Sequence, residues 1–394
     1  MMAPNSWIPS TKTLQRPLRL ANSTTSVMVS ISHPPNSSSI LIQVHDIQNC
    51  ITTFNLENAV CNHGFFMMAP NSWILSTKTF QRPLRLANST TSVMISISHP
   101  PNSSSILIQV HDIQNVSLED EKAILKQVGR MLRISEGDER NVREFQSMHP
   151  EAKKKGFGRL FRSPTLFEDA VKSILLCNCK WTRTLDMARA LCELQAELAD
   201  GWNSENIVKH PKKKGIKRKK FARKQSKVNK CVDQSCSNSQ LLEGNNNKVK
   251  ALGNFPSSKE LATLTEGYLE KRCKLGYRAC QIFELAERAE EGKLKLKLKK
   301  TSSYEEIYDK LSKIKGFGPY ACATLMMCIG FYQVVPMDTE TKRHLQQVHK
   351  TKKENAKEDV KRIYDKLELL EYYEIKFGKL SMLPNSSYHI VTGS

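Results

Sequence analysis

One carboxylate, Asp338, stands in unusual surroundings. It follows the apolar run 334–336 and is flanked by Thr339 and Thr341. An acid at the end of a buried segment can supply a fixed negative charge to a reaction, because little water screens it there. The same residue is also a good N-cap for a helix over residues 339–345. The two roles are compatible, so Asp338 is a candidate catalytic residue and a candidate cap.

The residues before this acid predict two helices joined by a tight turn. Residues 304–314 place apolar side chains on one helical face. Gly316 and Gly318 break that pattern, because a tight turn needs a positive φ and close backbone approach. Pro319 suits the first position of a second, almost wholly apolar helix. The N–H groups at the start of such a helix can bind a phosphate, and a plain helical hairpin without a ligand is the simpler alternative.

A near-identical repeat occupies the N-terminal part of the chain. Residues 1–49 recur at 67–115 with three differences, which in the second copy are Leu75, Phe80 and Ile95. Two copies this similar indicate a recent duplication of a coding segment or an error in the gene model, not a solenoid. Only the second copy is preceded by residues 54–66 and followed directly by helical sequence. We therefore expect the second copy to fold, and residues 1–52 not to fold as a domain.

The elements that must position the hairpin and its acid follow from periodicity. Alternating β-branched runs around a Pro/Asn-rich turn predict a β-rich subdomain over residues 53–116. Helical periodicity predicts a first helical part over 117–203 and a second over 255–394. Residues 204–254 are polar and rich in lysine, which predicts a disordered insertion. The expected fold class is α+β and mainly α, with a β-rich N-terminal subdomain before an all-α domain.

The charge is strongly basic and unevenly distributed. The chain has 60 Lys and Arg against 39 Asp and Glu, a formal net charge of +21. Residues 209–230 contain twelve Lys or Arg and no acid. This pattern predicts a nuclear protein that binds DNA and is recognised by a nuclear-import receptor through residues 209–230. A solvated loop or a non-specific RNA tether is the alternative for that tract.

The eleven cysteines and the apolar segments exclude other classes of protein. No secretory signal precedes the cysteines and none has zinc-finger spacing, so we expect reduced thiols, no metal centre and no cofactor. The most apolar stretch, residues 320–336, is shorter than the ~20 residues that span a bilayer. We expect a soluble monomer without a membrane partner.

These motifs together resemble a known family. The hairpin Gly316-Phe317-Gly318-Pro319, followed by Val-Pro-Met-Asp at 335–338, resembles the helix-hairpin-helix DNA glycosylases with a Gly/Pro-rich loop and a following Asp (HhH-GPD). Leu-Gly-Tyr-Arg-Ala at 275–279 and residues 160–192 are similar to the 8-oxoguanine glycosylase branch, especially to plant members with a lysine-rich insertion. Residues 62–73 are loosely similar to the Gly-x-x-Phe-x-Trp opening of its β-rich domain.

The resemblance implies an enzyme of base-excision repair that flips a damaged purine out of duplex DNA and hydrolyses its N-glycosidic bond. Asp338 would stabilise the positive charge that develops on the sugar and help to place the nucleophile. Gly316 and Gly318 would belong to the phosphate-binding hairpin. Asn178 would fill the gap left by the extruded nucleotide, and Arg183 would contact the opposite base. The residues assigned to the substrate pocket are Tyr277, Arg278 and Gly64.

Two departures from the family pattern affect the expected mechanism. Glycosylases that also cut the strand carry a Schiff-base lysine where this chain has Tyr320, a residue of the DNA-binding hairpin. Lys313 and Lys315 precede the turn, so water is the expected nucleophile and no AP-lyase activity is expected. After Asp338, residues 363–380 indicate a shortened closing segment, and a missing packing helix can cost several kcal/mol.

Three readings of function remain. A glycosylase for a damaged purine is the leading one, with an oxidised or an alkylated base both open. A non-catalytic helix-hairpin-helix DNA-binding protein is the second, although it would need neither Asp338 nor the segment 275–279. A protein whose functional part is the basic tract alone is the third, and such a tract binds polyanions without specificity.

Overall fold

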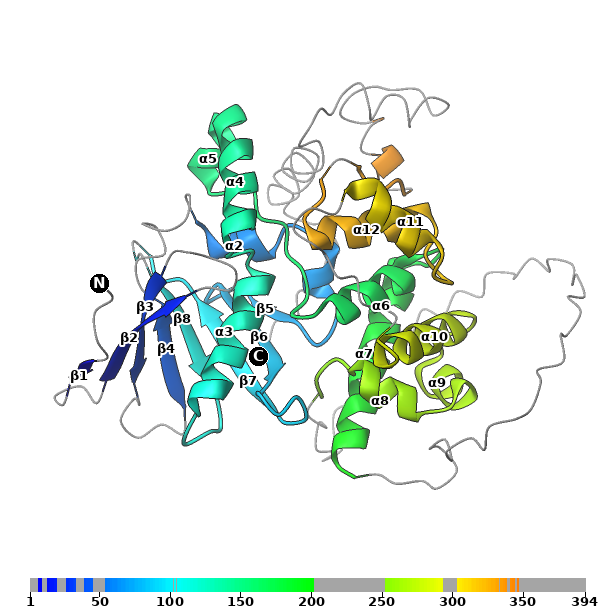
Figure 1. Cartoon of the computed structure of the whole chain (residues 1–394), viewed down its shortest axis with the longest axis horizontal. Coiled ribbons are helices and arrows are strands. Elements are labelled where there is room, and N and C mark those ends of the chain that lie inside the picture. Colours follow the sequence, from blue (N-terminus) through cyan, green and yellow to red (C-terminus); the bar gives the residue numbers. More distant parts are fainter. Residues whose placement is uncertain are drawn as a thin grey trace, which may run out of the picture.

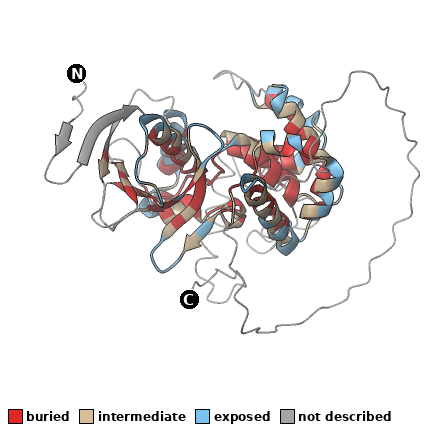
Figure 2. Cartoon of the chain, turned by 90° about the horizontal axis from the view of Figure 1, so that it is seen from below, coloured by how far each residue is buried: buried red, intermediate tan, exposed pale blue. Residues whose placement is uncertain are grey.

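The computed structural model divides into a sheet and a helical region (Figure 1). It describes strands 6–8, 13–19 and 26–32, then residues 39–44, 54–201 except 102 and 104, 252–292, and 303–343 except 333, 339 and 340, with residue 346. Buried residues, red in Figure 2, lie along the sheet and continue into the interior of the helical region. The predicted fold class, α+β and mainly α, is confirmed.

The strands of the described chain form one antiparallel sheet in the order β1-β2-β3-β4-β8-β7-β6-β5. Side chains alternate between its faces: Phe80, Arg82 and Leu84 are buried on one side of their strand, and Gln81 lies on the other. The strands are β1 (Ser6–Ile8), β2 (Thr13–Arg19), β3 (Ser26–Ser32), β4 (Ile40–Val44), β5 (Ser72–Ile74), β6 (Thr79–Arg85), β7 (Ser92–Ser98) and β8 (Ile106–Val110).

The first copy of the repeat supplies half of these strands. β1 to β4 extend the sheet of the second copy, and β4 pairs antiparallel with β8. Ile40 and Ile42 of β4 are each 1% exposed. Residues 1–52 were expected not to fold as a domain, and the pairing of their strands with the second copy was not predicted. The division of the chain into domains stays a prediction.

Helices cover the sheet and build the second half of the molecule (Figure 1). Ser or Thr caps several of them and accepts a hydrogen bond from the backbone N–H three residues on, as at Ser117, Thr165 and Ser303. The helical elements are α2 (Leu56–Val60), the 3₁₀ helix η2 (Gly64–Met67), α3 (Leu118–Met131), α4 (Glu136–Met148), α5 (Pro150–Lys155), α6 (Leu166–Leu176), α7 (Trp181–Ala199), α8 (Ser258–Thr263), α9 (Glu266–Cys273), α10 (Arg278–Glu290), α11 (Tyr304–Ser312) and α12 (Pro319–Ile329).

A buried charged cluster joins the sheet to α6. Arg82 of β6 contacts both carboxylate oxygens of Glu168, at 3.2 and 3.0 Å, and Lys172 pairs with the same carboxylate at 2.7 Å. All three side chains are almost fully buried. Burial alone would raise the pKa of Glu168, but the charges of Arg82 and Lys172 outweigh it and lower this pKa to about 2. A charged cluster buried this deeply fixes how the two halves pack, because breaking it leaves an unpaired charge.

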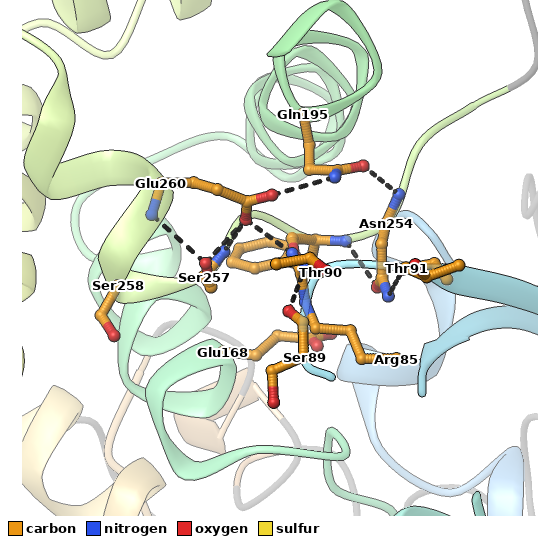
Figure 3. A network of polar contacts seen from close by, with 12 residues as sticks. Arg85, Ser89, Thr90, Thr91, Glu168, Gln195, Asn254, Ser257, Ser258 and Glu260 are labelled. Atoms are coloured by element: carbon orange, nitrogen blue, oxygen red, sulfur yellow. Dashed lines mark hydrogen bonds and ion pairs between the residues drawn. The ribbon is translucent and has the colours of Figure 1, made fainter. Parts of the chain in front are cut away.

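Both ends of the basic insertion are attached to the same helix. Residues 204–251 of the predicted insertion lie outside the described residues, and its last three residues, from Leu252, belong to the described fold. Gly253 presses against α7, where a Cβ would lie 2.5 Å from Gln195 Oε1. The Asn254 N–H donates to that same oxygen at 2.8 Å, and Gln195 also donates to Glu260 (Figure 3). The insertion therefore leaves and rejoins the fold at the C-terminal half of α7.

Candidate nucleic-acid interface

The hairpin between α11 and α12 forms as predicted, and glycine occupies its two positions for different reasons. Gly316 has φ +98, and a Cβ there would lie 3.0 Å from Gln281 of α10. The backbone conformation favours glycine at this position, and a side chain there would also crowd Gln281. Gly318 has φ −78, and a Cβ there would meet nothing within 4 Å. The two features predicted for this turn are divided between the glycines: Gly316 has the positive φ, and Gly318, without a side chain, leaves the backbone open to approach.

The start of α12 has the features of a phosphate site. Pro319 is its first residue, no side chain caps it, and Cys322 N–H donates to the Gly318 carbonyl at 2.9 Å. The N–H groups of a first helical turn have no partner within the helix and carry its partial positive charge. Tyr320 is half-buried in this turn, and the Thr324 hydroxyl donates to its carbonyl at 2.9 Å. A DNA phosphate fits this position chemically.

The loop that carries Asn178 joins α6 to α7. Asn178 is exposed and has φ +48, a left-handed conformation that asparagine tolerates. Arg278, the first residue of α10, is 4% exposed and donates to the carbonyls of Cys177 and Asn178. The Tyr277 ring lies 4.5 Å from the Arg278 guanidinium carbon, and its hydroxyl donates to Cys177 O at 3.4 Å. The segment 275–279 thus holds the backbone of the Asn178 loop.

Two further predicted residues border the same loop. Arg183, in the first turn of α7, donates to the Lys274 carbonyl at 3.0 Å and so joins α7 to the end of α9. Gly64, the first residue of η2, faces Trp181 at the start of α7, where a Cβ would lie 3.0 Å from the tip of the indole. The structure therefore brings Gly64, Asn178, Arg183, Tyr277 and Arg278 to one region. Their predicted roles toward DNA and the flipped base stay predictions.

The hairpin reaches this region through α10. Gly316 packs on Gln281 of α10, three residues after Arg278, and α12 packs along α6, which ends at the Asn178 loop. Asp338 lies beyond α12 and is half-buried. Its Oδ1 accepts from the Thr341 N–H at 2.6 Å and from the Thr341 hydroxyl at 2.8 Å. The N-cap role of Asp338 is confirmed, and its catalytic role stays a prediction.

Sequence reasoning missed a buried charged network at the other end of α12. Arg133 donates to Met327 O at 2.7 Å, and Arg162 donates to Cys328 O at 2.8 Å. Asp138 accepts from both arginines, at 3.2 and 2.8 Å. Burial opposes ionisation of Asp138, yet the charges of Arg162 and Arg133 lower the pKa of its carboxyl.

This network anchors the end of α12, ten residues before Asp338. It therefore fixes the point from which the chain runs to the candidate catalytic acid. The sequence carried one signal for it, because Arg133 stands between the apolar residues Leu132 and Ile134.

In the part of the chain that the structure describes, no group of His, Cys, Asp and Glu side chains is placed to hold a metal ion, and no helix is long and apolar enough to cross a bilayer. Residues 209–230 and 363–380 lie outside the described residues. The import tract and the shortened closing segment stay predictions.

Comparison with solved structures identifies the fold. MBOgg1 in complex with a low-affinity DNA ligand matches with a TM-score of 0.53 and 17% identity, over 89% of this chain and 99% of that one. The 8-oxoguanine glycosylase/lyase of Clostridium acetobutylicum in its apo form matches with a TM-score of 0.53 and 16% identity, over 88% and 97%. The 3-methyladenine DNA-glycosylase of Archaeoglobus fulgidus matches with a TM-score of 0.53 and 14% identity, over 84% and 97%.

At these identities the likeness shows the fold, which this chain shares with DNA glycosylases over nearly its whole length. No family model and no curated protein matches the chain. The predicted closeness to plant proteins stays a prediction.

Proposed function

We propose that the protein is a DNA N-glycosylase of base-excision repair, which acts on a damaged purine flipped out of duplex DNA. One observation carries this proposal: α10 connects the glycine hairpin to the Asn178 loop. Gln281 of α10 contacts Gly316, and Arg278 of α10 holds the carbonyls of Cys177 and Asn178. The candidate phosphate site and the exposed Asn178, which could enter a gap in the duplex, are thereby both held by contacts with α10.

Each part has a physical task in such a reaction. The start of α12 would hold a backbone phosphate without reading sequence. Asn178 would fill the space vacated by the flipped nucleotide, so that the duplex keeps its stacking. Asp338 would oppose the positive charge on the sugar as the bond to the base breaks. Within the described residues its two side-chain hydrogen bonds both end on Oδ1, so capping leaves Oδ2 to face a substrate.

Tyr320 supports a hydrolysis without strand cleavage. A phenol carries no amine and cannot form the Schiff base that strand cleavage requires. Lys315, the nearest lysine before the turn, instead pairs with Glu284 at 3.0 Å and contacts Cys280 Sγ at 2.8 Å. That pairing directs its amine toward α10. Water is therefore the nucleophile in the proposed reaction.

The base is proposed as a damaged purine, oxidised or alkylated. Structures of both an 8-oxoguanine glycosylase/lyase and a 3-methyladenine glycosylase match this chain equally well by TM-score. The fold therefore supports both substrate classes. The overall sequence pattern favours an oxidised purine, while the hairpin without a lysine is shared with alkylpurine glycosylases.

A non-catalytic DNA-binding protein is the second candidate function, because Asp338 already has a structural task as a helix cap. A panel of duplexes, each with one defined lesion, separates the two. The glycosylase reading predicts base release from one class of damaged purine, with the strand cut only after alkali. Binding to all duplexes with no abasic product would favour the binding protein.

Borohydride tests the mechanism in the same panel, because it reduces a Schiff base to a permanent protein–DNA link. We expect no link to form with wild-type protein. A link trapped at the rate of base release would show that a lysine acts, and hydrolysis by water would then be wrong.

A further inference from the structure

The pairing between the two copies of the repeat is self-complementary. β4 and β8 have the same sequence, Ile-Leu-Ile-Gln-Val, and pair antiparallel over all five residues. Ile42 lies opposite Ile108 at the centre, Ile40 lies opposite Val110, and Val44 lies opposite Ile106. Since each residue of β4 has its counterpart in β8, two β8 strands from different chains would make the same five pairs about a two-fold axis.

β8 needs a partner along this edge. In the second copy alone, the sheet would end with β5 on one side and β8 on the other. β5 has three residues, and short edge strands resist unwanted pairing. β8 has five residues with no charge and no proline, so nothing in its sequence protects it. In the full sheet both outer strands, β1 and β5, are three-residue Ser-Trp-Ile segments.

The apolar face along this edge is continuous across the two strands. Ile40 and Ile42 are each 1% exposed, and Ile106 and Ile108 are equally well buried. The outward-facing residues are half-buried: Leu41 lies opposite Gln109, and Gln43 lies opposite Leu107. The edge thus offers main-chain hydrogen bonds and an apolar face that only a strand of the same alternation can cover.

From this pairing we propose that the β8 edge is a docking surface for β8 of a second copy of this chain, and that β4 occupies it within the same chain. In the paired copies, residue 108 would lie opposite 108, and 107 opposite 109 of the partner. Such an interface is isologous, so it closes as a two-fold dimer and does not grow into a filament. The first copy of the repeat therefore keeps the protein monomeric.

The first experiment expels β4 from the sheet in the full-length chain. The variant Ile42→Asp would bury a carboxylate between β3 and β8, which is strongly unfavourable. We expect wild type to elute with light-scattering mass 44.8 kDa and the variant at twice that mass, 89.6 kDa, with its helical circular dichroism retained. The matched control is Gln43→Asp, which places the same charge on the half-buried outer face and should stay monomeric.

The second experiment distinguishes dimerisation through β8 from nonspecific association. The triple variant adds Leu107→Lys and Gln109→Lys to Ile42→Asp. In the dimer it would set lysines opposite lysines in two cross-strand pairs, and like charges there are destabilising. We expect this triple variant to be monomeric. Mixing it with the matching Leu107→Glu, Gln109→Glu chain, also carrying Ile42→Asp, should restore the dimer.

Several results would overturn the proposal. They are a wild-type dimer, a monomeric or helix-depleted Ile42→Asp variant, and oligomers that the two lysines fail to disperse. None of these results depends on DNA or on catalysis.

Discussion

At the scale of single residues, the candidate site depends on Arg278 as much as on Asn178. A left-handed asparagine at the tip of a loop keeps its place only if the backbone beside it is held. The Arg278 guanidinium does this from a buried position, with the Tyr277 ring against it. A motif that sequence reasoning placed in a substrate pocket therefore also acts on the loop that would enter the DNA.

Arg278→Ala should slow base release without abolishing binding to undamaged duplex. The lost hydrogen bonds from a buried charged group contribute about 1.5–3 kcal/mol, which corresponds to a rate loss of roughly tenfold to hundredfold. Single-turnover base release and the Kd for undamaged DNA measure the two effects. The matched control is Arg189→Ala, because Arg189 is exposed on α7. Equal rates for the two variants would remove the positioning role from Arg278.

At the scale of elements, part of this structure follows from local sequence and part does not. The hairpin of α11 and α12 and the strands of the second copy follow from periodicity and from glycine and proline, which act over a few residues. The pairing of β4 with β8 joins residues 62 to 70 positions apart, and no local signal sets it. Arg82 and Glu168 read as surface charges, because only the folded chain shows that they pair in the core.

The cluster between β6 and α6 makes stability depend on pH. The charges of Arg82 and Lys172 outweigh burial and depress the folded pKa of Glu168 to about 2, from an ordinary value of 4.5. The stabilisation is therefore present above pH ~4.5 and is lost as the pH falls toward 2.

Glu168→Gln should thus be far less stable than wild type at pH 7, by about 3–5 kcal/mol, because two buried cations lose their partner. The difference should shrink at pH 3, because Glu168 is then mostly protonated in the unfolded chain, where its pKa is the ordinary 4.5, while the folded wild type still holds it charged. Urea unfolding of both proteins at the two pH values measures this change. Glu151→Gln, on the exposed surface of α5, serves as the control. A difference in unfolding free energy between the two proteins that stays constant with pH would contradict the role of the Glu168 charge.

At the scale of the whole molecule, the points where the basic insertion joins the described fold lie far along α7 from the candidate interface. α7 begins three residues after Asn178 and runs through 19 residues to Ala199, which is ~28 Å at the helical rise. Gly253 rejoins α7 near that far end. The insertion is therefore attached to the fold at the end of α7 that lies away from the Asn178 loop.

Deleting residues 209–230 should spare base release in vitro and remove the protein from the nucleus. The tract holds twelve cations and no acid, which suits an import receptor. Base release by the purified variant and the location of a fluorescent fusion measure the two expectations. Replacing the deleted segment with Gly/Ser of equal length controls for loop length. A fusion that stays nuclear would exclude the import role, and lost activity would place the tract in the DNA-binding surface.

In the proposed reaction, the Asp338 carboxylate stabilises the positive charge on the sugar as the bond to a damaged purine breaks. Asp338→Asn tests it most directly, because asparagine removes the charge, keeps the volume and still serves as an N-cap for Thr341. The assay uses the lesion duplex from which the wild type releases the base. We expect the single-turnover rate of base release to fall at least ~100-fold, equivalent to the roughly 2.7 kcal/mol that a lost electrostatic stabiliser costs. The Kd for the duplex should change less than about twofold, since 1.4 kcal/mol would be needed for tenfold. Base release by the variant at the wild-type rate would contradict the claim.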